Sequence, residues 1–105
     1  MAVKVWGVIM QEEMIDFEVK NLRKKKTFNI QMSKKDSLFD LHAEILSVNK
    51  WQPEHLFSFF MSDEFWDDEN EYAGDPFSAG KSKIKLEKLK LKQGDTFLFL
   101  YDYGD

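Results

Sequence analysis

The residues of this chain best suited to chemistry are its two histidines and two of the aspartates near its C-terminus. His42 lies on the apolar face of a segment with helical spacing, so its ring should point toward the predicted sheet. His55 opens a predicted strand, and Asp102 and Asp105 flank a Tyr-Gly pair. Imidazole and carboxylate groups can ligate a metal ion or act as a general acid and base. Their spacing does not force the four side chains to meet. Structural roles are therefore the favoured interpretation, and we predict no metal and no cofactor.

Aromatic and acidic residues are interleaved in the segment from residue 62 to residue 82. Phe65, Trp66 and Tyr72 lie among the carboxylates between Asp63 and Asp75. Carboxylate oxygens suit calcium, but the spacing of an EF-hand loop is absent. The later part of the segment is rich in glycine and serine, which predicts an exposed loop carrying at most a short strand. A solvated acidic loop is the simpler interpretation, and a contact surface for a protein partner is the functional one.

Basic residues are concentrated in two regions. One contains the run Arg23, Lys24, Lys25 and Lys26, and the other has six lysines between residues 81 and 92. Either region could contact phosphates, but 15 basic against 19 acidic residues give a formal net charge of -4 and no overall basic footprint. Lysines also protect strand edges from aggregation. Solubility is therefore the favoured interpretation, and nucleic-acid binding is kept as an alternative.

Motifs of common enzyme classes are absent from the sequence. It contains no cysteine, glycine-rich phosphate loop, nucleophile elbow or zinc-binding helix pair. An enzyme is therefore not favoured. A metal-dependent enzyme using the two histidines and two aspartates is kept as a third hypothesis.

The periodicity of apolar residues predicts an α+β domain. Alternation predicts strands over residues 3–10, 15–19, 28–32, 55–61 and 95–103, and helical spacing predicts a helix over residues 38–48 with Ser37 as its N-cap and Asn49 as its C-cap. Residues 84–91 would form a short strand or a helical turn. The order of hairpin, helix, strand, connector and strand predicts a β-grasp-like (ubiquitin-like) mixed sheet with one main helix packed across it.

The 105 residues fit a single domain, with an additional N-terminal strand in residues 1–13. The predicted core consists of the following residues or their strand neighbours: Phe28, Ile30, Leu38, Leu41, Ile45, Leu56, Phe57, Phe59, Leu98 and Leu100. The apolar run from Val5 to Met10 is too short to span a membrane. We therefore expect a soluble cytoplasmic protein without a membrane partner.

A spaced set of motifs resembles a known family. The set comprises Ser37-Leu38-Phe39-Asp40-Leu41-His42-Ala43-Glu44-Ile45, Trp51, His55-Leu56, Phe59, Gly94-Asp95-Thr96-Phe97 and Tyr101-Asp102-Tyr103-Gly104-Asp105. In this order, and over roughly residues 14–105, the set resembles the plasmid pRi ORF-three-like family. Two features depart from that pattern: the family usually continues with a further strand after the Gly-Asp turn, and the run Arg23 to Lys26 stands where the family tends to have proline, tryptophan and paired arginines.

The resemblance implies membership of a family of mostly uncharacterised bacterial and archaeal proteins, some of which are labelled transposon passenger or TnpR-like. A serine resolvase needs several arginines at the phosphate, and Arg23 is the single arginine of this chain, so recombinase activity is not expected. The leading hypothesis is a small interaction module associated with mobile elements. It would engage an unknown protein through an open sheet edge or the acidic aromatic loop. In the absence of a further strand, the last strand either exposes an edge or is covered by the N-terminal strand.

Overall fold

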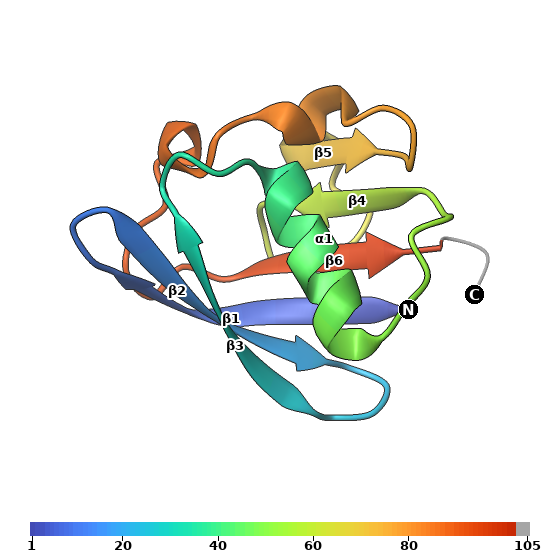
Figure 1. The fold of residues 1–105 in the computed structure, drawn as a ribbon, viewed down its shortest axis with the longest axis horizontal. Coiled ribbons are helices and arrows are strands. Elements are labelled where there is room, and N and C mark those ends of the chain that lie inside the picture. Colours follow the sequence, from blue (N-terminus) through green and yellow to red (C-terminus); the bar gives the residue numbers. More distant parts are fainter. Residues whose placement is uncertain (103–105) are drawn as a thin grey trace.

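The computed structural model describes residues 1–102 of the chain. Its strands and single α-helix are β1 (Ala2–Met10), β2 (Met14–Asn21), β3 (Thr27–Ser33), α1 (Leu38–Asn49), β4 (Phe57–Phe60), β5 (Glu71–Gly74) and β6 (Phe97–Tyr101). Three short 3-10 helices, η1 (Asp68–Asn70), η2 (Gly80–Lys83) and η3 (Leu86–Leu89), lie in the connections. The α+β class with one main helix is confirmed, and α1 crosses one face of the sheet (Figure 1).

The six strands form one sheet in the order β3-β2-β1-β6-β4-β5. Every neighbouring pair is antiparallel, so the predicted mixed sheet is wrong. The reason is the position of β1, which lies between β2 and β6 and separates two strands that run in the same direction. Of the two alternatives for the last strand, covering by the N-terminal strand is the one observed.

Helix α1 begins with the predicted capping box. The Ser37 hydroxyl accepts a hydrogen bond from the Asp40 N–H, and the Asp40 carboxylate accepts one from the Ser37 N–H. These bonds satisfy amide groups that a helix start leaves unpaired. The helix ends one residue later than predicted, because Lys50 adopts the left-handed conformation at the C-cap, with φ of 58°. The Asn49 side chain instead donates to the carbonyl of Ile45 and accepts a hydrogen bond from Asn21.

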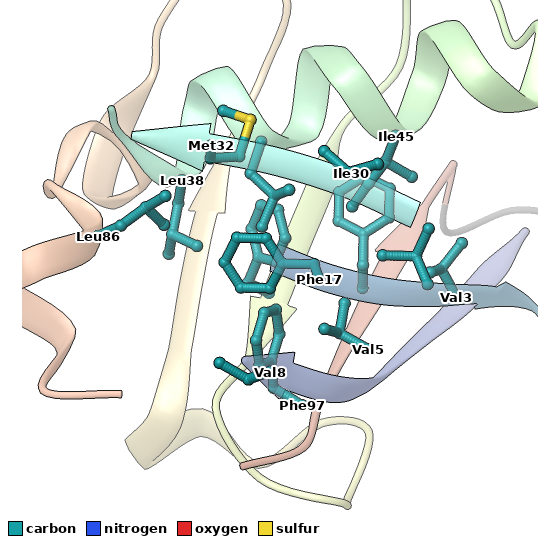
Figure 2. Packing of buried hydrophobic residues seen from close by; sticks show 14 of the residues in the cluster. Val3, Val5, Val8, Phe17, Ile30, Met32, Leu38, Ile45, Leu86 and Phe97 are labelled. Atoms are coloured by element: carbon teal, nitrogen blue, oxygen red, sulfur yellow. The ribbon is translucent and has the colours of Figure 1, made fainter. Parts of the chain in front are cut away.

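The core lies between α1 and the sheet. Figure 2 shows side chains from β1, β2, β3 and β6 packed with those of α1 and with Leu86 of η3. In β6 the core side chains are Phe97, Phe99 and Tyr101. Leu98 and Leu100 alternate with them and therefore point to the other face of the sheet. The prediction that Leu56 is buried is wrong, since its side chain is 53% exposed. Leu56 lies just before β4 and not within it.

Among residues 1–102, no helix has the length and apolar character needed to cross a membrane.

Candidate functional site

The structure brings two of the four predicted chemical residues together. The side chains of His55 and Asp102 lie close together, with 3.7 Å between Nε2 and Oδ2, and both are partly exposed. Asp102 adopts the left-handed conformation, with φ of 58°, and its N–H donates to the carbonyl of Leu56. Exposed pairs of this kind contribute little stability, so the pair is a weak attachment between the chain before β4 and the end of β6.

His42 lies away from this pair, beneath α1. Its ring stacks on Phe57 with 3.8 Å between ring centroids and 12° between ring planes, and the residue is only 4% exposed. A carbonyl oxygen can only accept a hydrogen bond, so the 3.1 Å contact between Nδ1 and the Phe39 carbonyl places the proton of the neutral ring on Nδ1. His42 is therefore a buried histidine whose ring is bonded to a backbone carbonyl.

A metal centre receives no support from the described residues. Within residues 1–102 there is no group of three or more histidine, aspartate or glutamate side chains that could hold a metal ion. Asp105, the fourth predicted residue, lies outside the described residues.

Burial lowers the pKa of His42 below its ordinary value of about 6.5, and the hydrogen bond with Phe39 opposes this effect more weakly. The unfolded chain therefore binds a proton at a higher pH than the folded chain does. We expect the free energy of unfolding to be greatest above pH 6.5 and to fall as the pH drops toward the folded-state pKa. The slope from one proton is at most about 1.4 kcal/mol per pH unit.

Chemical denaturation between pH 5.5 and pH 8 would measure this dependence. The variant His42→Phe keeps an aromatic ring beside Phe57 but cannot bind the proton, so its stability should depend less on pH than that of the wild type. Equal slopes for the wild type and His42→Phe would contradict the prediction.

The chain before β4 is held by a tyrosine hydroxyl that sequence reasoning did not identify. The hydroxyl of Tyr101 donates to the carbonyl of Gln52 and accepts from the N–H groups of Glu54 and His55. The ring also stacks on Trp51, with 5.8 Å between centroids and 3° between planes. The only signal in the sequence is a tyrosine in an otherwise apolar strand, which predicts a buried ring with a hydrogen-bonded hydroxyl but not its partners.

The basic run from Arg23 to Lys26 forms the turn between β2 and β3. The side chain of the buried Asn21 holds this turn by accepting hydrogen bonds from the N–H groups of Arg23 and Lys24. Figure 1 places the turn near the N-terminus, whereas η2 and η3, which carry lysines of the second basic region, lie on the other side of α1. The two basic regions therefore do not form one continuous patch.

The acidic aromatic loop folds back over the sheet face opposite α1. Phe65 and Trp66 pack edge-on against Phe60 of β4, with centroid distances of 6.0 and 5.9 Å, and Trp66 remains 57% exposed. The Asp63 carboxylate accepts a hydrogen bond from the Thr96 hydroxyl at 2.7 Å. Tyr72 does not lie with Phe65 and Trp66. It is part of β5, where it pairs with Phe59, and its side chain packs against the core. The three predicted aromatic residues therefore do not form one surface.

Strand β3 is a free edge of the sheet. It pairs with β2 in continuous register from Met14↔Ser33 to Lys20↔Thr27. The N–H of Asn21 donates to the carbonyl of Lys26, so Asn21 and Lys26 are a hydrogen-bonded pair. In an antiparallel ladder hydrogen-bonded pairs alternate with pairs that are not hydrogen-bonded, so this bond determines which β3 residues direct their N–H and C=O groups toward β2. The N–H and C=O groups that point away from β2 consequently belong to Thr27, Asn29, Gln31 and Ser33.

Only one of these four positions is occupied by the chain itself. The Asp36 carboxylate accepts a hydrogen bond from the Ser33 N–H, and the Asp36 N–H donates to the Ser33 carbonyl. Within residues 1–102, no hydrogen bond reaches the outward groups of Thr27, Asn29 or Gln31. The other end of the sheet differs, because η2 packs against β5. Gly80 of η2 lies so close to β5 that a side chain in its place would put its Cβ 2.8 Å from the Ala73 carbonyl oxygen.

Comparison with known proteins identifies a family but no characterised relative. A family model described as plasmid pRiA4b ORF-3-like protein matches residues 15–105. No curated protein and no solved structure matches the chain. Strand β1 precedes the matched residues, although it occupies the middle of the sheet.

Proposed function

Since the chain belongs to the plasmid pRiA4b ORF-3-like protein family, whose name specifies no chemistry, we propose its function from its surface. The protein is an interaction module that binds an extended segment of a partner protein along the free edge of β3. The added segment would become a seventh strand next to β3. The observation that carries this proposal is the row of outward amide groups at Thr27, Asn29 and Gln31.

The character of β3 supports strand addition. Most proteins protect an exposed edge with charged side chains, proline, a bulge or a very short strand. β3 has seven residues, TFNIQMS, without proline or charge, and its register with β2 has no bulge. Each outward N–H and C=O group that pairs with a partner backbone replaces a hydrogen bond to water, and alternate side chains of the partner then contact the sheet faces.

The surface beside β3 indicates the chemistry of the partner. A hollow of about 400 Å³ extends from this edge across β2 to Ile9 of β1. Its wall includes Asp16 and Glu18, the polar residues Asn29 and Gln31, and the apolar residues Phe17 and Ile30. Side chains of a bound strand alternate between the two faces of the sheet. We therefore propose that the partner segment carries lysine or arginine at alternate positions, so that its cations lie over these carboxylates.

A proline substitution tests this mode of binding. Peptides that bind the wild-type protein would be selected from a random peptide display library, and their affinities measured for Asn29→Pro and Asn29→Ala. Asn29→Pro removes an outward N–H group that a partner needs and leaves the ladder to β2 intact, since that N–H points away from β2. Asn29→Ala removes the same side chain but keeps the N–H, so it is the matched control.

We expect the selected peptides to be extended and basic at alternate positions, to bind Asn29→Ala within about threefold of wild type, and to lose at least tenfold in affinity for Asn29→Pro. Amide hydrogen exchange should show new protection at Thr27, Asn29 and Gln31 on binding. Recovery of no peptide, equal binding to both variants, or protection confined to residues 62–72 would overturn the proposal. The last result would favour the surface formed by Phe65 and Trp66.

The other proposed functions have weaker support. Nucleic-acid binding through Arg23 to Lys26 would depend on one small turn, because the second basic region lies elsewhere. A metal-dependent enzyme would depend on His55 and Asp102 without His42. A cytoplasmic location and an association with mobile elements remain part of our proposal, the first from the cysteine-free sequence and the second from the family's name.

We also infer that the fold is a modified β-grasp. Without β1 the strand order would be β3-β2-β6-β4-β5, and β2 and β6 would be parallel neighbours in the centre of the sheet. A mixed sheet of this kind with one helix across it is the arrangement that the sequence predicts. In this interpretation β1 is an added strand placed between the two parallel ones.

A further inference from the structure

A cavity beside α1 has the features of a ligand site that is separate from the β3 edge. It has a volume of about 340 Å³ and lies between the helix, the chain at Trp51 and Pro53, and the turn at Pro76. An engineered apolar cavity of about 150 Å³ in another protein holds benzene. The cavity here is therefore large enough for a bicyclic aromatic ring.

The wall of the cavity is apolar and uncharged. The helix contributes Phe39, His42, Ala43, Leu46 and Ser47. No lysine, arginine, aspartate or glutamate is among the lining residues. A charged ligand would lose its hydration without gaining an ion pair, so a neutral ligand is favoured.

His42 contributes a polar atom to this wall that a ligand could use. The Nδ1–H of His42 is used by the Phe39 carbonyl, which leaves Nε2 as a hydrogen-bond acceptor. Nε2 has no hydrogen-bond partner within residues 1–102. In the same residues, every fully buried side-chain nitrogen or oxygen atom has a hydrogen-bond partner, so Nε2 is not fully buried. Nε2 therefore retains some exposure to solvent even though His42 is 96% buried, and His42 is one of the residues that line this cavity.

The ring of His42 is also fixed in orientation. Phe57 stacks against one side, and Phe39 lies 4.9 Å away between ring centroids. An acceptor held in a fixed position in an apolar wall selects ligands that place a donor opposite it, because a ligand without the donor leaves the acceptor desolvated and unpaired. We propose that this cavity binds a small neutral aromatic molecule that carries one N–H or O–H donor, which hydrogen-bonds to Nε2 of His42.

Indole and 1-methylindole are the probes, because they share a bicyclic ring and differ in the N–H donor. Titration of the full-length protein would be followed by NMR, using the amide signals of α1 and the indole N–H signal of Trp51. We expect indole to shift the signals of Ala43 and Ser47 and to bind roughly threefold to tenfold more tightly than 1-methylindole, the ratio expected for one hydrogen bond.

Two variants, with a control, test separately whether the cavity binds the probes and whether Nε2 of His42 accepts the hydrogen bond. Ala43→Leu adds bulk at an exposed helix position that lines the cavity and should abolish binding of both probes, whereas Glu44→Leu adds the same side chain on the neighbouring residue outside the cavity and should not. His42→Phe keeps the stacked ring but removes the acceptor, so the preference for indole should disappear. Absence of binding by either probe, or binding that survives Ala43→Leu, would overturn the site. Equal affinities of wild type for the two probes would overturn the role of Nε2.

Discussion

Replacement of Phe99 by alanine should lower the free energy of unfolding by about 3–5 kcal/mol. Phe99 is fully buried in β6, which pairs with β1 on one side and β4 on the other. Its ring lies 4.7 Å from that of Phe59 and 5.9 Å from that of Phe57, between ring centroids. Truncation would leave a large cavity between the sheet and α1. Because β1 and β4 hold β6 in place on both sides, the site has little freedom to collapse.

Equilibrium denaturation with urea measures this change, and Phe77→Ala is the matched control. Phe77 is 98% exposed at the tip of the turn between Asp75 and Ser78, so the same substitution should change stability by less than about 0.5 kcal/mol there. A loss below 1 kcal/mol for Phe99→Ala, or similar losses for the two variants, would show that the centre of the sheet is packed differently.

Removal of a single oxygen from Tyr101 is expected to destabilise the fold by about 1–3 kcal/mol. Tyr101→Phe keeps the buried ring but removes the three hydrogen bonds that join the end of β6 to Gln52, Glu54 and His55. Part of the chain before β4 would lose its attachment to the sheet. Hydrogen exchange at the amides of Glu54 and His55 should accelerate more than exchange in β1 and β2.

Tyr72→Phe provides the comparison for this variant. The hydroxyl of Tyr72 makes no hydrogen bond within residues 1–102, so its removal should alter stability by less than about 0.5 kcal/mol. Equal stabilities of Tyr101→Phe and wild type in urea denaturation would contradict a structural role for the Tyr101 hydroxyl.

Local signals in the sequence predicted the local structure. The helix start at Ser37 was predictable because the capping box involves residues only three positions apart, and the strands of the β2–β3 hairpin were predictable from alternation. The final strand was harder to orient, since both of its faces are apolar and periodicity alone could not choose between Phe99 and Leu98. The pairing of β1 with β6 was predicted only as one of two alternatives, because it joins residues far apart in the sequence and no local pattern selects it.

In the site, too, local features were predictable from the sequence and long-range contacts were not. His42 was expected to point toward the sheet from its position on the apolar face of the helix, and it does so. The pairing of His55 with Asp102 and the hydroxyl contacts of Tyr101 depend on how the chain before β4 crosses the end of β6. Those contacts span more than forty residues, so no pattern within a short window contains them.

The location of β1 between β2 and β6 has a consequence for synthesis of the protein on the ribosome. One neighbour of β1 is made almost immediately after it, but the other is made last, after residues 11–96 have been added. At a usual rate of about 5–20 residues per second, that delay is on the order of ten seconds. During this time the edge of β1 that will pair with β6 remains open in the nascent chain, and Val3 and Val5 lack the covering of Phe97 and Phe99. The nascent protein should therefore need protection by a chaperone most strongly just before β6 emerges.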